Sequence, residues 1–305
     1  MKSSEERQGL LAIIGANVIF GLNIPITKAL VESWMTPMGY TTTRMLFGTL
    51  LFWGLGVLGK KEKVGARDLL VIAVGGLLGY LGTQFLFSQS LMYTSPVVYS
   101  LLMALTPVFV LLLAALFLKE RIPMRKILGI LTSIVGATLV IVLGAKGDAQ
   151  RANNVLGIVF ALLCVLSYAG YLVITRSVSV KYQPVTIAKY MFLVSAVVAA
   201  PFGLSDLSSQ KVFSIDTTGL ALGLLGYSLV FSTFLAFFLM PYALKRLEAG
   251  SVSIFMNLQP IVASAAAIAV GQDFLSWEKI AAVILVVAGV YFVTSRQRIQ
   301  QGVKP

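Results

Sequence analysis

Ten long apolar stretches alternate with short polar segments along the chain, and this alternation predicts most of its structure. The hydrocarbon core of a bilayer is about 30 Å thick, and a helix of about 20 apolar residues crosses it. Short connections make consecutive helices antiparallel. The expected transmembrane helices are 9–31, 37–58, 69–91, 95–118, 127–144, 154–175, 185–204, 218–243, 249–270 and 277–294.

The composition supports a protein that faces lipid. Charged residues make up 12% of the chain and hydrophobic residues 58%, whereas a soluble domain carries roughly 25% charged residues. The chain has no His and a single Cys, Cys164, which excludes disulfides, His/Cys metal sites and His-dependent catalytic triads. The run at 54–61 has Lys61 where a Walker A loop needs Ser or Thr. We therefore expect no nucleotide and no other cofactor.

The net charge of +12 is distributed as in a membrane protein. Basic residues flank the apolar stretches and form no basic face with interleaved aromatics, which argues against a nucleic-acid partner. With the N-terminus inside, every basic residue lies on the cytoplasmic side except Lys28, Arg44, Lys146, Arg151, Lys211 and Lys279. By the positive-inside rule, we expect a multi-pass protein of the inner (plasma) membrane with both tails, 1–8 and 295–305, in the cytoplasm.

An internal repeat divides the chain into two halves. A shift of 153 positions superimposes helix-breaking, acidic and glycine positions, namely Pro107 on Pro260, Glu120 on Asp273 and Gly136 on Gly289. Each half, 9–144 and 154–294, contains an odd number of expected spans, so the second half is inverted in the membrane. We predict an all-α integral membrane protein of ten transmembrane helices, built as two inverted five-helix repeats. Secondary transporters use this architecture.

Several segments resemble a known family. The segment LKERIPMRKILGILTSIVGATLVI carries the marked positions of the EamA-type, ten-helix branch of the drug/metabolite transporter superfamily, at Glu120, Arg121, Gly129 and Gly136. The opening IIGANVIFGLNIPITKAL and Arg44 are also similar to that family, whereas Met191 stands opposite Arg44 in the second half. The resemblance covers essentially the whole chain and implies a two-repeat exporter or importer of metabolites.

Polar side chains inside the spans are the candidate substrate-binding residues. On the first span, Phe20, Asn23 and Thr27 fall on one helical face at spacings of three and four. The eighth span carries Tyr227, Phe231 and Ser232. An amide in hydrocarbon must find a partner, which is either a neighbouring helix or a substrate in a cavity between the repeats. The candidates are Asn23, Arg44, Tyr80, Gln84, Tyr168, Tyr171, Tyr227 and Asn257.

Arg44 is the most informative of these residues. It lies seven residues past Pro37, roughly 10 Å into the helix at 1.5 Å per residue. A central Arg costs about 2.5–3.5 kcal/mol on insertion scales, and snorkelling lowers that cost. Two interpretations follow. Arg44 either extends to the outer headgroups or meets an anionic group of the substrate, bidentately if that group is a carboxylate.

The acidic residues all map to loops or ends of the expected helices. Proton-coupled carriers expose a carboxylate inside the membrane, so the sequence favours facilitated movement or exchange. We predict a secondary transporter, an exporter or facilitator, of small metabolites such as amino acids or related compounds, working by alternating access. Gly75 and Gly79 have the spacing of close helix packing. The fifth and tenth spans are nearly free of central polar groups and should be peripheral.

A passive channel, a membrane-embedded enzyme and a purely structural role are the alternatives. The lack of His and of acids inside the spans disfavours an enzyme, so we expect no enzymatic activity. The expected partners are a small-molecule substrate and the lipid bilayer, and a homodimer stays open. The sequence leaves the substrate, the direction of transport and the coupling ion open as well.

Overall fold

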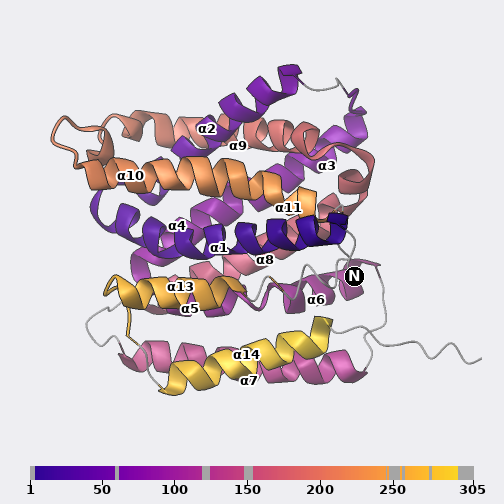
Figure 1. Cartoon of the computed structure of the whole chain (residues 1–305), viewed down its shortest axis with the longest axis vertical. Helices are drawn as coiled ribbons and strands as arrows, with labels where there is room; N and C mark the ends of the chain where they lie inside the picture. Colours follow the sequence, from indigo (N-terminus) through magenta and orange to yellow (C-terminus); the bar gives the residue numbers. More distant parts are fainter. Residues whose placement is uncertain are drawn as a thin grey trace, which may run out of the picture.

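Long helices lie side by side along one common direction, as the apolar stretches predict (Figure 1). The computed structural model describes residues 4–58, 62–118, 124–147, 154–244, 246, 255, 258–274 and 277–294. Every regular element in this described part is a helix. Each stretch predicted to span the membrane contains a helix, although residues 249–254, 256 and 257 of the ninth stretch lie outside the described residues.

The helices follow a similar order in the two halves of the chain. The first half contains α1 (Ser4–Ser33), α2 (Pro37–Leu58), α3 (Ala66–Gly76), η1 (Leu77–Gly82), α4 (Thr83–Tyr93), α5 (Pro96–Met103), α6 (Thr106–Leu118) and α7 (Met124–Gly147). The second half contains α8 (Asn154–Lys181), α9 (Pro184–Leu207), η2 (Lys211–Phe213), α10 (Gly219–Tyr227), η3 (Ser228–Leu235), α11 (Ala236–Leu244), α13 (Leu258–Ala269) and α14 (Trp277–Thr294).

Proline starts three of these helices, at Pro37, Pro96 and Pro184. The first turn of a helix leaves its N–H groups without intrahelical partners, so a missing N–H loses nothing there. At the start of α5, the Ser95 side chain accepts a hydrogen bond of 3.3 Å from the N–H of Val98. These local signals place the helix starts close to where the sequence predicts them.

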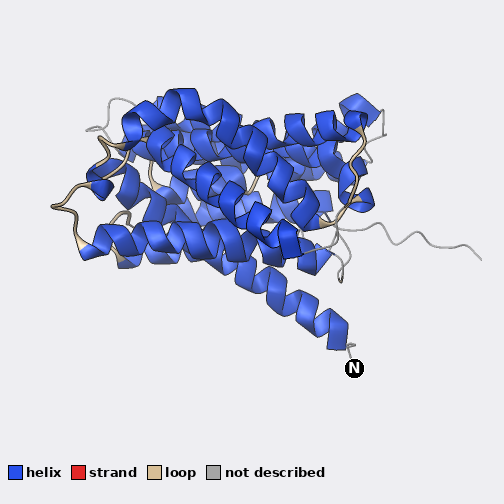
Figure 2. Cartoon of the chain, turned by 90° about the horizontal axis from the view of Figure 1, so that it is seen from above, coloured by secondary structure: helices blue, strands red, loops and turns tan. Residues whose placement is uncertain are grey.

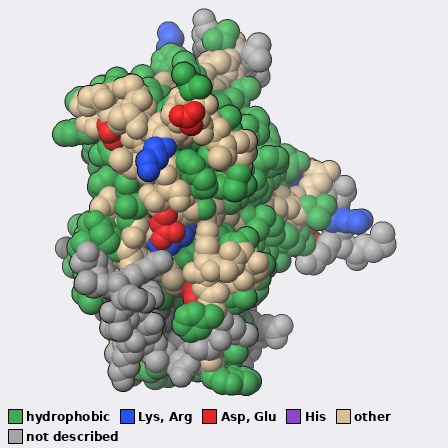
Figure 3. All heavy atoms as spheres, turned by 90° about the vertical axis from the view of Figure 1, so that its left-hand side faces the viewer, with side chains coloured by type: hydrophobic (Ala, Val, Ile, Leu, Met, Phe, Trp, Pro, Cys, Tyr) green, Lys and Arg blue, Asp and Glu red, His purple; other side chains and the backbone are tan. Residues whose placement is uncertain are grey.

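Helices of membrane-crossing length and apolarity are the main elements of the bundle. In the described part of the chain six helical stretches meet both criteria, namely Glu5–Ser33, Ala66–Tyr93, Pro96–Phe117, Asn154–Thr175, Pro184–Leu207 and Gly219–Met240. Figure 3 looks onto one end of the bundle and shows charged side chains on that end and apolar side chains along the flanks. This distribution is that of an all-helical membrane protein.

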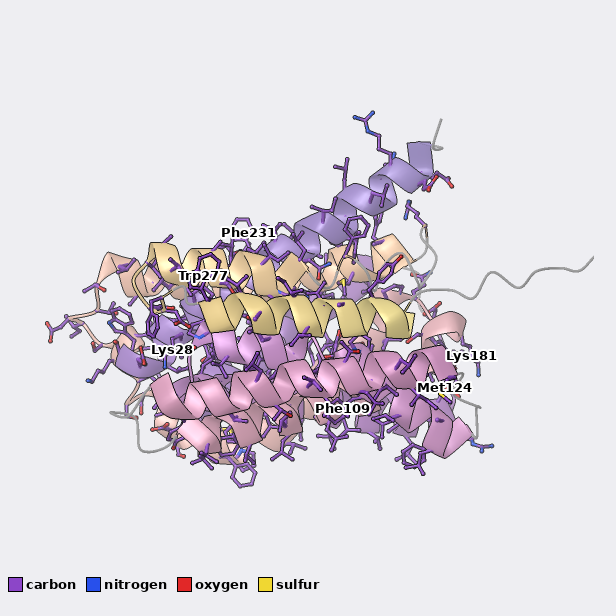
Figure 4. All side chains as sticks on the ribbon, turned by 90° about the horizontal axis from the view of Figure 1, so that it is seen from below. Lys28, Phe109, Met124, Lys181, Phe231 and Trp277 are labelled. Atoms are coloured by element: carbon purple, nitrogen blue, oxygen red, sulfur yellow. The ribbon has the colours of Figure 1, made fainter. Side chains whose placement is uncertain are left out.

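Helices of one half pack mainly against helices of the other half. α2 packs along α9, α7 along α14, α1 against α13 and α11, and α8 against α4 and α6. The pair α7 and α14 forms the outermost layer of the bundle (Figures 1 and 4). The prediction that the fifth and tenth spans are peripheral is therefore confirmed.

Two π-helical segments, η1 and η3, interrupt matching helices of the two halves. Shifted by the 153 positions that separate Pro107 from Pro260, η1 falls within η3. A π turn bonds each N–H to the carbonyl five residues back and so accommodates an extra residue. The hydroxyls of Thr83 and Thr233 each donate to a carbonyl five residues back, that of Leu78 and that of Ser228, both at 2.9 Å.

Polar contacts tie the helices together at both ends of the bundle. At one end Lys28 Nζ donates to the Leu91 carbonyl at 2.6 Å and pairs with Glu32 at 2.7 Å, which joins α1 to α4. At the other end Lys181 pairs with Asp68. Figure 4 shows Lys28 and Lys181 at opposite ends. The N-terminal part of α1 projects from the bundle at the Lys181 end (Figure 2).

Candidate functional site

A cavity of about 200 Å³ lies between the two halves of the chain. Its wall is formed by α1, α2, η1, α4, α5 and α6 of the first half and by α8, η3, α11 and α13 of the second. Six of the eight candidate residues line it, namely Asn23, Arg44, Tyr80, Gln84, Tyr168 and Tyr171. The fold therefore brings together residues that are widely separated in the sequence.

Arg44 is buried in this wall, with 1% of its surface exposed. Its Nε donates to Thr233 Oγ1 at 2.8 Å, and its Nη2 donates to Ser232 Oγ at 3.1 Å. Its Nη1 donates to Gln84 Oε1 and, at 3.4 Å, to the hydroxyl of Tyr40. The side chain is held inside the bundle by four neutral acceptors. Of the two interpretations of Arg44, the one in which it extends to the headgroups is wrong.

The contact with Arg44 fixes the orientation of the Gln84 amide. A guanidinium has only donors, so the amide turns its Oε1 toward Arg44 and its NH₂ group away. That NH₂ group has no hydrogen-bond partner in the described part of the chain. The Ser232 hydroxyl accepts from Arg44 and keeps its own proton for another acceptor. This part of the wall therefore presents hydrogen-bond donors.

Tyrosines form a second part of the wall. The ring centroids of Tyr168 and Tyr171 are 5.6 Å apart, and those of Tyr80 and Tyr171 are 6.1 Å apart. Phe237 of α11 extends this group, with its ring centroid 5.0 Å from that of Tyr80. Aromatic faces at such separations form an apolar surface suited to a flat or apolar ligand. We call Tyr80, Tyr168 and Tyr171 the tyrosine wall.

Two glycines allow this wall to form. A Cβ atom at Gly79 would overlap the ring of Tyr171, and one at Gly75 would overlap the side chain of Thr175. The absence of side chains therefore brings α3 and η1 close to α8. The prediction of close helix packing at Gly75 and Gly79 is confirmed.

Charge in the cavity has a single sign. Arg44 lines it, whereas no Asp or Glu is found among its described lining residues. Within the same described part of the chain, no group of three or more His, Cys, Asp or Glu side chains could hold a metal ion. The cavity is thus suited to a small molecule that accepts hydrogen bonds and has an apolar surface.

Comparison with known proteins identifies the family. The EamA-like transporter family matches the chain twice, over residues 7–142 and 155–295. The chain belongs to the EamA-like transporter family. The resemblance to the drug/metabolite transporter superfamily is therefore confirmed. As a member of a transporter family with several apolar membrane-crossing helices, it is a multi-pass membrane protein.

Relatives of this EamA-like chain are also named as transporters. An uncharacterized transporter of Archaeoglobus fulgidus is 28% identical over 267 residues, which cover 87% of this chain and 91% of the relative. A protein of Streptantibioticus cattleyicolor named "Probable terminal-alkyne amino-acid exporter" is 29% identical over 201 residues, covering 65% of this chain and 64% of the relative. A crystal structure with 21% sequence identity matches with a TM-score of 0.62, over 96% of this chain and 99% of that one. The fold is therefore shared with a solved structure.

Asn23 lines the cavity but is already engaged by its neighbours. Its Nδ2 donates to Thr27 Oγ1 at 3.2 Å and to the Tyr40 hydroxyl at 3.5 Å. Its Oδ1 accepts from Ser228 Oγ at 2.9 Å. In this EamA-like chain Asn23 thus joins α1 to α2 and η3, whereas Gln84 keeps donors for a ligand.

The structure does not bring Tyr227 into the cavity wall. Its hydroxyl donates to the Ile19 carbonyl at 3.2 Å, and its ring stacks on that of Phe231 with 5.2 Å between centroids. Phe231 is 44% exposed and lies at the bundle surface (Figure 4), whereas Ser232 is buried. The π-helical segment η3 begins directly after Tyr227 and changes which of the following residues share its helical face. Asn257, the remaining candidate, lies outside the described residues.

Several lining residues were missed by sequence reasoning. Pro107 and Pro260 mark the repeat and also line the cavity, so their repetition was a usable signal for the site. Gln259 lines it and donates to Asn17 Oδ1 at 2.7 Å, which joins α13 to α1. The lining residue Tyr99 lies in the strongly apolar α5, where nothing in the sequence distinguishes it from core side chains. Phe87 lies three residues after Gln84 on α4, so its position was a usable signal for the site.

Proposed function

We propose that this chain is a secondary transporter of small metabolites, such as amino acids or related compounds, which works by alternating access. One observation carries the proposal: both halves of the chain supply the wall of a single cavity. When two repeats enclose one site, rocking of one repeat against the other exposes that site to one side of the membrane at a time.

We further propose that the chain has ten transmembrane helices in two inverted five-helix repeats, 9–144 and 154–294. The family matches each half separately. Exchange of the halves preserves the packing pattern, because α1 meets α13 and α11 as α8 meets α6 and α4. The segments η1 and η3 interrupt corresponding helices. An odd number of helices in each repeat inverts the second repeat.

The proposed orientation places both termini in the cytoplasm at the inner membrane, as the basic segments favour. It is tested by single cysteines introduced at positions 146 and 304 after Cys164→Ala removes the native thiol. A membrane-impermeant maleimide added to intact cells should label position 146 and leave position 304 unlabelled. Labelling of both positions from the same side contradicts the ten-helix proposal.

Two observations support the substrate class and the transport mode. One relative is named as an exporter of an amino acid, a class of molecule with a size suited to a compact cavity. No carboxylate lines the described cavity wall, which favours facilitated export or exchange over proton coupling. A passive channel is the competing function, and saturable exchange distinguishes a carrier from it.

Counterflow in liposomes tests this function. Purified protein is reconstituted into liposomes loaded with an unlabelled amino acid, and uptake of the same labelled amino acid is measured for each standard amino acid. We expect saturable uptake for a subset, which persists when a protonophore collapses the proton gradient. Tyr168→Leu should lower the initial rate, whereas Tyr227→Leu, outside the cavity wall, is the matched control. Uptake that rises linearly with concentration and does not depend on internal substrate indicates a channel. The absence of uptake for every amino acid contradicts the proposal.

A further inference from the structure

One end of the cavity offers a buried positive charge and hydrogen-bond donors, and the other end offers aromatic faces. From this arrangement we propose that the substrate carries a carboxylate that binds Arg44, joined to a compact apolar or aromatic body that lies against the tyrosine wall. The inference rests on the proposed transport function and specifies the chemical class that the site selects.

The charge of Arg44 is the first argument. A buried charge is costly unless it is paired, and the four contacts of Arg44 are to uncharged side chains. These hydrogen bonds use four of the five guanidinium N–H groups, so an entering carboxylate accepts from the remaining Nη2 N–H and displaces one neutral acceptor to form its second hydrogen bond. Charge-assisted hydrogen bonds are about twice as strong as neutral ones, which favours this exchange. An entering carboxylate supplies the counter-charge that the described wall lacks.

The surrounding donors are the second argument. Gln84 has its NH₂ group available, and Ser232 has its hydroxyl proton available, because both use their oxygen atoms to accept from Arg44. The hydroxyls of the tyrosine wall also have no hydrogen-bond partner in the described part of the chain. Donors without acceptors suit a ligand group that only accepts, and an ionised carboxylate is such a group.

The rest of the wall limits what the carboxylate is attached to. No described lining residue is acidic, so an ammonium group on the substrate finds no ionic partner. The tyrosine wall and Phe237 offer apolar faces instead. A dianion would bring two charges to a single buried cation. The site therefore selects a substrate with one carboxylate and an apolar body. An amino group on that substrate adds little to the affinity.

Four probes that share a phenyl ring test the contributions of the carboxylate and the amino group to binding. They are 3-phenylpropionate, phenylalanine, phenethylamine and 3-phenylpropionamide. Dissociation constants are measured by calorimetry with the protein in lipid nanodiscs. We expect the two carboxylates to bind within about threefold of each other, and the amine and amide to bind at least about tenfold more weakly. Equal binding of acid and amide, or no binding of either acid at concentrations up to about 10 mM, overturns the inference.

A variant of Gln84 gives a second test that does not remove Arg44. Gln84→Glu has nearly the same shape and places a carboxylate beside the guanidinium. It should raise the thermal stability of the empty protein, because the buried charge gains a partner, and it should abolish the preference for acid over amide. A purely structural Arg44 would gain the same stability while probe binding stayed unchanged, and that result overturns the inference.

Arg44→Lys supplies the conservative comparison, because lysine keeps the charge and loses the planar fork. We expect 3-phenylpropionate to bind at least about tenfold more weakly to this variant, and full retention of its affinity contradicts the carboxylate contact.

Counterflow with the same probes distinguishes failure of the proposed transport function from failure of the proposed substrate class. Acid-selective binding without counterflow contradicts the transport function alone. Counterflow that does not discriminate between acid and amide contradicts this inference alone.

Discussion

Two buried cations, Arg44 and Lys28, have similar exposure and opposite surroundings. Each has 1% of its surface exposed. Lys28 lies near one end of the bundle, where it pairs with the Glu32 carboxylate and donates to the Leu91 carbonyl. Arg44 lies in the cavity wall and contacts neutral hydroxyl and amide groups. Burial is the same at both sites, and the charge of the partner differs.

The difference separates a structural cation from one available to a ligand. Removing Lys28 breaks its ion pair with Glu32 and its hydrogen bond to the Leu91 carbonyl, and both losses destabilise the fold. Removing a cation whose contacts are neutral breaks no ion pair. Lys28 should therefore matter for stability and Arg44 for transport, and four predictions test this distinction.

The largest effect is expected in transport. Arg44→Gln should lower the initial rate of transport by about 100-fold at subsaturating substrate, because about 2.7 kcal/mol of charge-assisted binding is lost. Lys28→Gln should stay within about threefold of the native rate. Both rates are measured in liposomes at equal protein content. Equal losses for the two variants would remove the distinction between the two cations.

The next largest effect is expected at the two amides of the cavity wall. Asn23 should matter mainly for stability and Gln84 mainly for substrate binding. Asn23→Leu removes the partner of Ser228 and of Thr27, so it should lower the free energy of unfolding by about 2 kcal/mol. Gln84→Leu removes one of the four acceptors of Arg44 and leaves the other three, so it should lower the melting temperature less than Asn23→Leu does and weaken substrate binding. Thermal unfolding in detergent and probe binding are measured on both proteins. A destabilised Gln84→Leu protein with normal binding would reverse the assignment.

A smaller effect on stability is expected at the cations themselves. Lys28→Met should lower the free energy of unfolding by about 1–2 kcal/mol, because the ion pair with the partly exposed Glu32 and the hydrogen bond to the Leu91 carbonyl are both lost. Arg44→Met should cause no comparable loss, because removal of a buried charge without an ionic partner offsets the loss of its four hydrogen bonds. Melting temperatures of the two variants in one detergent provide the comparison. A larger loss for Arg44→Met would show that its neutral contacts hold the bundle together.

The smallest effect on stability is expected at the exposed ion pair of Lys181 and Asp68. This pair is the reference for a cation that is accessible to water. The hydrogen bond from Lys181 to Asp68 raises the pKa of Lys181 above its ordinary value of 10.5. While Asp68 is ionised, the pair contributes fully below pH 10.5 and loses its contribution as the pH rises through the raised pKa of Lys181. The small difference in melting temperature between the native protein and Lys181→Met should disappear above that pKa. A difference that persists there would point to packing by the lysine stem.

Much of the fold could be predicted because bilayer crossing leaves a long apolar signal. The helix positions, the peripheral fifth and tenth spans and the close packing at Gly79 all follow from local composition. The placement of Tyr80 and Gln84 on one face follows from polar positions at helical spacing, and both line the cavity. These features need no information about contacts between distant residues.

The remaining parts of the site depend on distant contacts and on local changes in helix geometry. Arg44 and Ser232 are 188 residues apart in the sequence, so the partners of Arg44 could not be known in advance. Tyr227 is a candidate because it is a polar residue inside an expected span, and that criterion does not indicate which side of the helix faces the cavity. Asn23 and Gln84 differ in the neighbours that donate to their amide oxygens, Ser228 for Asn23 and Arg44 for Gln84. The sequence does not reveal these neighbours.

The matched position of η1 and η3 bears on the history of the chain. A π turn is produced by inserting one residue into an α-helix, and the two halves hold such turns at corresponding places. One insertion before the ancestral gene was duplicated accounts for both turns, whereas later insertions would have had to occur twice at the same place. On this account the ancestral unit already contained the interrupted helix before it was duplicated. Present-day proteins of half this length should then show a π turn at the matching position.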